Sequence, residues 1–159
     1  MHVKRLIAKF WARIWCVRHL KYAKIPRTDV VSLYESLVRP ILDFACPAYH
    51  SLLTRGQCES LERLQKHALK IIHGWNVSYA ASLEHTGLEK LEDRRERLVE
   101  QFANKAATHP RFALEWFPEK ITRREGLREN EVYHHIRPRT ERYKRNPVYY
   151  MKKMMEPRE

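Results

Sequence analysis

Apolar residues recur at helical spacing over the first two thirds of the chain. Between residues 3 and 23 they follow one another at steps of three or four, which places them on one face of a helix: Val3, Ile7, Phe10, Ile14 and Val17. This helix should end before Pro26, because the residue preceding a proline is pushed out of the α region. A second stripe follows, for which Thr28 is the expected N-cap: Val30, Tyr34, Leu37, Ile41 and Phe44. Since Pro40 lies within it, we expect a kink or two consecutive helices.

The third helix has its own start and stop signals. Thr54 and Gln57 have the spacing of a capping box, in which two side chains satisfy the free backbone donors of a first helical turn. Gly74 is a suitable left-handed C-cap. The buried stripe in between is predicted to contain Leu61, Leu64, Ala68 and Ile71. A short helix over 79–83, capped by Ser78, should follow.

A long helix is predicted before His109 and Pro110. Thr86 and Glu89 repeat the capping-box spacing and should open it. Its expected inner positions are Leu88, Leu91, Leu98, Phe102 and Ala106. No segment shows sustained alternation, so the sequence predicts an all-α fold. We expect a small bundle of four to six helices, with a basic N-terminal helix and a poorly ordered basic C-terminal tail. In that tail Pro138, Pro147 and Pro157 interrupt the periodicity, and one helical turn is expected near 149–155.

The charge divides the 159 residues into three segments. The chain is long enough for one domain with arms, and its formal charge is +12. Residues 1–27 carry eight basic side chains and no acidic one, and residues 28–117 carry eleven basic and twelve acidic ones. Residues 118–159 carry twelve basic and seven acidic ones. A near-neutral helical domain therefore lies between two basic segments, which indicates a polyanionic partner: nucleic acid or an anionic membrane surface.

Nucleic acid is the partner that these basic segments favour. Lysines and arginines on a helix face can bind phosphates without regard to sequence, and arginines interleaved with tyrosine can grip a backbone and stack on unpaired bases. The candidate RNA- or DNA-binding residues are Lys4, Arg5, Lys9, Arg13, Arg18, Lys21, Lys24, Arg139, Arg142, Lys144 and Arg145. Ordinary solvated surface is the competing interpretation of such charge.

Three other roles for the first helix stay open. A basic amphipathic helix with Trp and Phe also suits a lipid interface, and an acid-free N-terminus is a feature of mitochondrial transit peptides. The apolar residues of this helix could instead remain exposed and drive self-association. They are Phe10, Trp11, Ile14 and Trp15.

The sequence contains few residues in the spacing that a catalytic or metal-binding site needs. The three aspartates are not adjacent to one another, whereas a two-metal site needs converging carboxylates. The glycines are too scattered for a phosphate cradle, and a Gly-x-Ser-x-Gly motif is lacking. The closest metal-ligand sets, Cys16 with His19 and Cys46 with His50 and Cys58, lack the paired spacing of zinc sites. We therefore expect no enzyme activity, no metal and no cofactor, and we expect Cys46 to be a small core residue.

The cysteine count bears on the compartment. Three cysteines without a secretory signal are typical of a reducing interior, so we expect an intracellular protein, nuclear or cytoplasmic. No apolar run reaches the length of about 18 residues that a membrane span needs.

Six sequence motifs follow one another between residues 31 and 143. They are VSLYESLVRPILDFACP at 31–47, LERLQKHALKII at 61–72, LEDRRERL at 91–98, HPRF at 109–112, WFP at 116–118 and RTERY at 139–143. In this order they resemble the C-terminal region of the reverse transcriptases of non-LTR retrotransposons, in which the first motif resembles the segment that follows the thumb and the second resembles the next block. The resemblance is closest to the jockey-like and CR1-like lineages and covers most of residues 10–150.

This resemblance implies a parent protein that copies RNA into DNA at a nicked chromosomal target. The catalytic Asp-Asp pair of the family has no counterpart here, so its catalytic residues have no positions onto which they can be carried. The expected protein is a non-catalytic C-terminal fragment, thumb end and beyond, that retains RNA or DNA binding. A truncated product without function is the alternative.

Overall fold

The computed structural model describes residues 2–117, 120–125, 128–133 and 139–156. The chain forms two compact units, one made of residues 1–46 and 53–95 and the other of residues 47–52 and 96–159. Residues 1–27, expected to be a basic arm, therefore belong to the first unit. Pro138 and Pro157, where we expected the periodicity to break, lie outside the described residues. The third such position, Pro147, was predicted wrongly, because it is the first residue of the helix Pro147–Met154.

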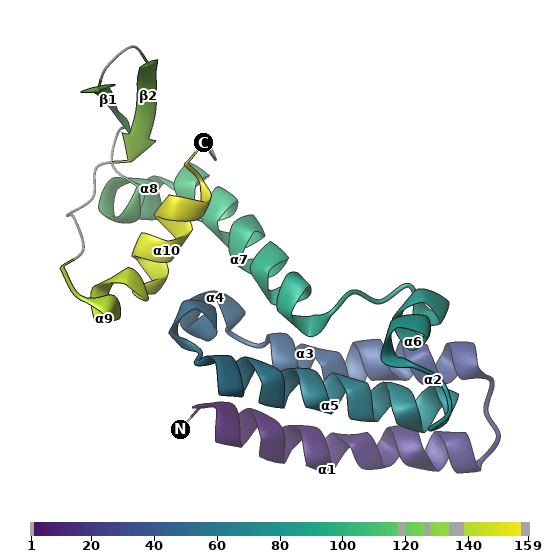
Figure 1. Ribbon diagram of the computed structural model, residues 1–159. Helices are drawn as coiled ribbons and strands as arrows, with labels where there is room; N and C mark the ends of the chain where they lie inside the picture. Colours follow the sequence, from purple (N-terminus) through teal and green to yellow (C-terminus); the bar gives the residue numbers. More distant parts are fainter. Residues whose placement is uncertain (1, 118–119, 126–127, 134–138, 157–159) are drawn as a thin grey trace. The chain divides into compact units, whose positions relative to one another are not determined.

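Helices alone build the described part of the first unit, which confirms the all-α prediction. They are α1 (His2–Tyr22), α2 (Arg27–Leu33), the π-helical turn η1 (Tyr34–Val38), α3 (Arg39–Asp43), α5 (Arg55–His73), α6 (Tyr79–Thr86) and the start of α7 (Leu91–Thr108). Figure 1 shows α1 and α5 side by side and running in the same direction, while α2, η1 and α3 run back beside them. This arrangement brings the C-terminal ends of α1 and α5 together.

The inner face of α1 is covered by the chain itself. Val3, Leu6, Phe10, Ile14 and Val17 are all buried, so the predicted stripe is correct except that Leu6 replaces Ile7. Two of the residues proposed for self-association are thereby removed from the surface, because Phe10 is 0% and Ile14 2% exposed. That part of the prediction was wrong, since α5 and the α2–α3 segment supply the packing partner. Trp11 and Trp15 do remain exposed, at 47% and 58%.

The π-helical turn η1 shifts the second stripe by one residue. Val30 and Tyr34 are buried as predicted, but beyond them Val38 and Leu42 take the inner positions expected for Leu37 and Ile41. A π turn accommodates one extra residue, so every later side chain rotates by one position. Phe44, predicted to be inside, is 67% exposed, and Cys46 is buried as a small core residue as expected. The expected break at Pro40 is confirmed, since η1 ends and α3 begins there.

The ends of α5 and α6 follow the predicted signals. The Thr54 hydroxyl accepts a hydrogen bond from the backbone nitrogen of Gln57, and the side-chain oxygen of Gln57 accepts one from the backbone nitrogen of Thr54, so the capping box is complete. Gly74 ends α5 at a positive φ of 105°, although its ψ of 166° differs from a left-handed helix. Ser78 caps α6 through the Ala81 amide, as predicted.

Two predicted caps are wrong. Thr28 lies inside α2, whose N-cap is Pro26, and its hydroxyl donates to Asp29 instead. The capping box expected at Thr86 does not form, because Gly87 adopts a left-handed conformation and ends α6. Thr86 is the last residue of α6, with its hydroxyl bonded back to Ser82 O, so α7 starts later than expected.

A network of buried polar groups fixes α5 in the first unit. The Tyr34 hydroxyl donates to Gln65 Oε1 at 3.3 Å, and Gln65 Nε2 donates to the Tyr79 hydroxyl at 3.1 Å and to Glu89 O at 2.8 Å. The Tyr79 hydroxyl in turn donates to Glu62. Burial raises the pKa of both tyrosines well above the usual value. Because the partners come from η1, α6 and the segment before α7, the network sets the position of α5 along its axis.

The second unit contains the tail. Its elements are most of α4 (Cys46–Tyr49), the 3-10 turn η2 (His50–Leu52), the remainder of α7, α8 (Pro110–Trp116), β1 (Lys120–Glu125), β2 (Arg128–Tyr133), α9 (Glu141–Lys144) and α10 (Pro147–Met154). Its buried residues are Tyr49, Val99, Ala103, Ala106, Phe117 and Met151, so Leu98 and Phe102 of the predicted stripe are not part of this core.

The tail contains more regular structure than we expected. Strands β1 and β2 form an antiparallel hairpin in which Lys120 pairs with Tyr133 and Glu125 with Arg128, and the sequence did not predict it. The helical turn expected near 149–155 is confirmed by α10. In the described residues the chain is also divided into more helices than the predicted four to six, because η1 separates α2 from α3, and α4, α8 and α9 were not predicted.

Candidate nucleic-acid interface

The seven basic side chains predicted to bind phosphates near the N-terminus all lie on the surface of the first unit. They are Lys4, Arg5, Lys9, Arg13, Arg18, Lys21 and Lys24. Within the described residues none of them forms an ion pair with a carboxylate. Their positive charges are therefore available to a polyanion.

The last three of these residues line a groove with residues of α5. Arg18, Lys21, Tyr22 and Lys24 form one wall, and His67, Lys70, Ile71 and Trp75 form the other. We call this cavity of about 490 Å³ the α1–α5 groove. Its lining contains four basic side chains and no carboxylate. A groove lined by one sign of charge concentrates ions of the opposite sign, so this surface suits a polyanion.

Lys21 holds the two walls together. Its ammonium donates a hydrogen bond to the carbonyl oxygen of Ile71 in the last turn of α5. That end of a helix carries a partial negative charge from the aligned peptide dipoles, which favours a cation there. This hydrogen bond links the two walls of the groove.

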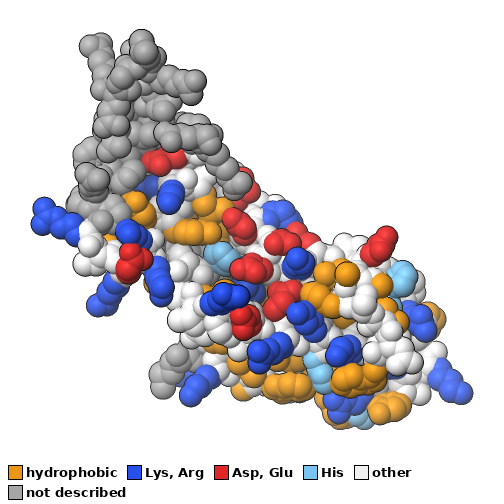
Figure 2. All heavy atoms as spheres, in the orientation of Figure 1, with side chains coloured by type: hydrophobic (Ala, Val, Ile, Leu, Met, Phe, Trp, Pro, Cys, Tyr) orange, Lys and Arg blue, Asp and Glu red, His pale blue; other side chains and the backbone are white. Residues whose placement is uncertain are grey.

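Aromatic rings lie next to the basic side chains. The Trp11 and His67 ring centroids are 4.9 Å apart, and those of His67 and Trp75 are 6.2 Å apart. Trp75 is 69% and Tyr22 77% exposed. Along the lower edge of Figure 2, over α1 and α5, hydrophobic, basic and histidine side chains lie beside one another. The surface thus combines groups that bind phosphates with rings that can stack on bases.

His67 lies between the two tryptophan rings, in surroundings that disfavour its charged form. Desolvation, followed by the charges of Arg18 and Lys70, lowers its pKa below the usual value. At neutral pH the imidazole therefore acts as an uncharged ring and a hydrogen-bonding group. Protonation at lower pH would add a positive charge to the groove.

The four basic residues predicted in the tail belong to the second unit. Arg139, Arg142, Lys144 and Arg145 are exposed in and around α9. Lys144 is already paired with Glu141 at 2.6 Å, which raises the pKa of Lys144 and lowers that of Glu141. A charge that is paired within the chain offers less to a phosphate, so Arg139, Arg142 and Arg145 are the stronger candidates of this group.

Sequence reasoning missed the α5 wall of the groove. His67, Lys70 and Trp75 lie in residues 28–117, whose charges nearly cancel. The net charge of that whole segment therefore gave no indication of a local basic cluster. A signal was present, because Lys66 and Lys70 are one helical turn apart and Trp75 directly follows the predicted cap Gly74. A window of ten residues would have shown a basic, aromatic cluster at this end of α5.

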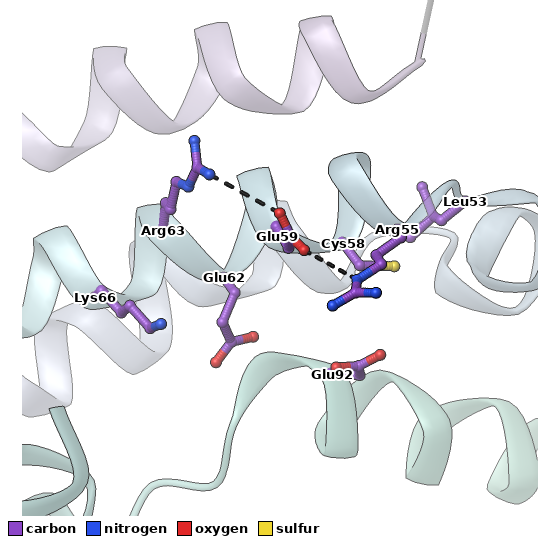
Figure 3. A pocket seen from close by; sticks show the side chains of 8 residues that line it. All are labelled: Leu53, Arg55, Cys58, Glu59, Glu62, Arg63, Lys66 and Glu92. Carbon is purple, nitrogen blue, oxygen red and sulfur yellow. Dashed lines mark hydrogen bonds and ion pairs between the residues drawn. The ribbon is translucent and has the colours of Figure 1, made fainter.

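A second cavity of the first unit has the opposite character. It measures about 720 Å³ and lies between α5 and the start of α7. Figure 3 shows that Arg55 and Arg63 are both bonded to Glu59, while Glu62 and Glu92 add further carboxylates. Because Arg55 and Arg63 are paired with Glu59 and further carboxylates line it, this cavity does not suit a polyanion.

Several carboxylates of the first unit are paired with arginines. Arg94 binds Asp43 at 2.7 Å and Glu89 at 3.5 Å, and Arg39, 5% exposed, binds Glu35 and Glu89. Arg95 is fully buried on the inner face of α7, next to the Cys58 thiol. These carboxylates stabilise the first unit and do not converge as metal ligands would.

The described residues show neither a metal cluster nor a membrane span. No group of three or more His, Cys, Asp or Glu side chains is placed to hold an ion there, and this includes the two Cys/His sets noted in the sequence. Across the ranges that the structure describes, every helix is too short or too polar to cross a membrane.

Comparison with known proteins adds no relative. No protein-family model, no curated protein and no solved structure matches this chain.

Proposed function

We propose that the chain is a non-catalytic nucleic-acid-binding module, derived from the C-terminal region of a non-LTR reverse transcriptase. The observation that carries the binding function is the α1–α5 groove, with four basic side chains, no carboxylate and exposed rings on both walls. The family origin rests on the ordered sequence motifs alone.

Binding is proposed to be independent of sequence. The basic side chains of the groove would bind phosphate oxygens, which are the same at every nucleotide. Lys4, Arg5, Lys9 and Arg13 extend the positive surface along α1, and Arg139, Arg142 and Arg145 would assist from the second unit. An intracellular location, nuclear or cytoplasmic, is part of the proposal, and the free thiols of Cys16, Cys46 and Cys58 support it.

The test is a neutralisation of the groove with a matched control. Arg18→Gln with Lys70→Gln removes two positive charges from the groove, and Arg55→Gln with Arg63→Gln removes two from the mixed cavity. Binding of a fluorescent 20-nucleotide strand, as RNA and as DNA, is measured by anisotropy at 0.1 M salt. Two lost phosphate contacts predict an affinity about 25-fold lower for the groove variant.

The control should bind within about twofold of the unchanged protein, because its arginines are already paired with Glu59. Equal losses in the two double variants would contradict the assignment of binding to the groove. Absence of binding by the unchanged protein would overturn the proposed function.

Self-association is a second candidate, favoured by one observation. Trp11 and Trp15 stand one helical turn apart on α1 and are 47% and 58% exposed. Exposed rings of this size on a helix are common at protein interfaces. Sedimentation velocity over a hundredfold range of concentration would reveal a dimer, and Trp11→Ser with Trp15→Ser should abolish it.

A further inference from the structure

Trp75 is presented to solvent by the way α5 ends. Gly74 has a positive φ of 105°, a conformation that turns the chain sharply at the C-cap. The indole that follows is 69% exposed, although a tryptophan is the residue with the most apolar surface to bury. The ring is nevertheless held in place, because Lys70 Nζ lies 5.1 Å from its centroid and His67 approaches at 75° to its plane. An exposed ring in a fixed position suits stacking.

Two hollows of like character flank this ring. One is the α1–α5 groove, and the other, of about 420 Å³, runs from Lys66 and Lys70 to the polar residues Asn76 and Ser78. Trp75 and Lys70 line both hollows, and neither lining contains a carboxylate. In the second hollow Lys66 Nζ lies 5.0 Å from the Tyr79 ring centroid. The track on both sides of Trp75 is therefore basic, with rings along it.

We infer that Trp75 is the stacking platform for an unpaired base, and that a single-stranded nucleic acid runs through the two hollows on either side of it. This inference rests on the proposed function and adds the strand type. A single strand can rotate a base outward onto an aromatic ring while its phosphates follow the cations. In a duplex the bases are already paired and stacked, so the ring has no base face to contact and only the phosphates bind.

Tyr22 provides a second ring at the far side of the groove. It is 77% exposed and shares the lining with Arg18 and Lys24. Because stacking depends on the π-face that every base has, both rings should accept any base. The predicted ligand is accordingly an unpaired stretch of RNA or DNA without sequence preference.

The experiment compares two tryptophan variants on two kinds of ligand. Trp75→Leu keeps an apolar side chain and removes the stacking ring, and Trp15→Leu is the matched control. Trp15 is 58% exposed, stacks on His19 at 3.8 Å and does not line either hollow. The probes are a fluorescent 20-nucleotide oligo-pyrimidine strand, as RNA and as DNA, and a 20-base-pair duplex. Thermal melts monitored by circular dichroism verify that each variant folds.

Loss of one stacked base predicts that Trp75→Leu binds the single strand on the order of ten- to a hundredfold more weakly, equally for RNA and DNA. Its affinity for the duplex should change less than about twofold, and Trp15→Leu should change neither. If Trp75→Leu leaves single-strand affinity unchanged, or lowers it as much as duplex affinity, stacking is refuted while nucleic-acid binding stands. If the unchanged protein binds neither ligand and instead sediments with anionic vesicles, both the inference and the proposed function are overturned.

Discussion

Lys24 occupies a backbone conformation that normally belongs to glycine. Its φ is +57°, and two hydrogen bonds close the end of α1 around it: Ile25 N to Leu20 O at 3.2 Å and Lys24 N to Lys21 O at 3.0 Å. This is the pattern of a Schellman motif with lysine at the position where glycine is usual. For a residue with a β-carbon the left-handed conformation costs about 1–2 kcal/mol. We therefore predict that Lys24→Gly stabilises the protein even though it removes a groove charge.

The expected gain is about 1 kcal/mol. Relief of the left-handed strain contributes about 1–2 kcal/mol, and the greater freedom of glycine in the unfolded chain offsets roughly 0.4–1 kcal/mol of it. A gain of this size should raise the melting temperature by about 2–4 °C in a chain of this length. Lys24→Ala is the control, because it removes the same charge and keeps the β-carbon.

Two assays separate strain from charge at this position. In urea denaturation, Lys24→Gly should be more stable than both the unchanged protein and Lys24→Ala. In nucleic-acid binding, the two variants should behave alike, each with a salt slope about 0.7 smaller in magnitude from the lost phosphate contact. If Lys24→Gly proves no more stable than Lys24→Ala, the left-handed conformation at residue 24 does not destabilise the protein. If only one variant loses affinity, the role of Lys24 is not that of a charge.

Three other measurements test different parts of the structure. Leu42→Ala should lower the free energy of unfolding by about 2–5 kcal/mol and Ile41→Ala by much less, because η1 turns Leu42 inward. Urea denaturation of the two variants measures this difference. A larger loss of stability in Ile41→Ala than in Leu42→Ala would contradict the shifted register. Desolvation, with the charge of nearby Arg27, lowers the pKa of His73, so the unfolded chain binds more protons below about pH 6.5. Stability should therefore be complete above that pH and fall as the pH drops, less so in His73→Gln; an identical pH profile for the two proteins would refute this. Burial raises the pKa of the Cys46 thiol to about 12, so iodoacetamide at pH 8 should modify it only after unfolding, as peptide mass mapping would show.

Local signals predicted the parts of the fold that depend on neighbouring residues. The capping box at Thr54 and the cap at Ser78 involve atoms at most three residues apart, and both formed as expected. The box predicted at Thr86 failed for an equally local reason, since Gly87 satisfies a second motif, the left-handed C-cap. Where two local motifs overlap, spacing alone does not decide between them.

The register of the second stripe depended on more than spacing. Leu37 is followed by Val38, and Ile41 by Leu42, so the inner face of the helix would be apolar with either pair on it. Tertiary packing selects Val38 and Leu42, and the π turn η1 makes that selection possible. The hairpin was not predicted because its strands are mostly polar and so lack an alternation of apolar and polar residues. Ile121, which pairs with Val132, forms its one aliphatic pair.

The sequence predicted one wall of the candidate site and not the other. The basic residues of α1 form an acid-free run and were found directly. The wall contributed by Lys70 and Trp75 becomes part of the site only when α5 packs beside α1, and contacts between segments about fifty residues apart are not encoded in spacing. Net charge over a long segment was a poor guide, because the acids near Lys70 in sequence lie elsewhere in space.

The most direct test of groove binding is the salt dependence of affinity for a single strand. The four phosphate contacts of the groove, from Arg18, Lys21, Lys24 and Lys70, should contribute about −2.8 to the slope of log affinity against log salt, or roughly a fiftyfold loss between 50 and 200 mM. Arg18→Gln with Lys70→Gln should lower the magnitude of the slope by about 1.4, which makes the loss over the same range about sevenfold smaller. A slope near zero in the unchanged protein, or one that this double variant leaves intact, would contradict binding of nucleic acid in the α1–α5 groove.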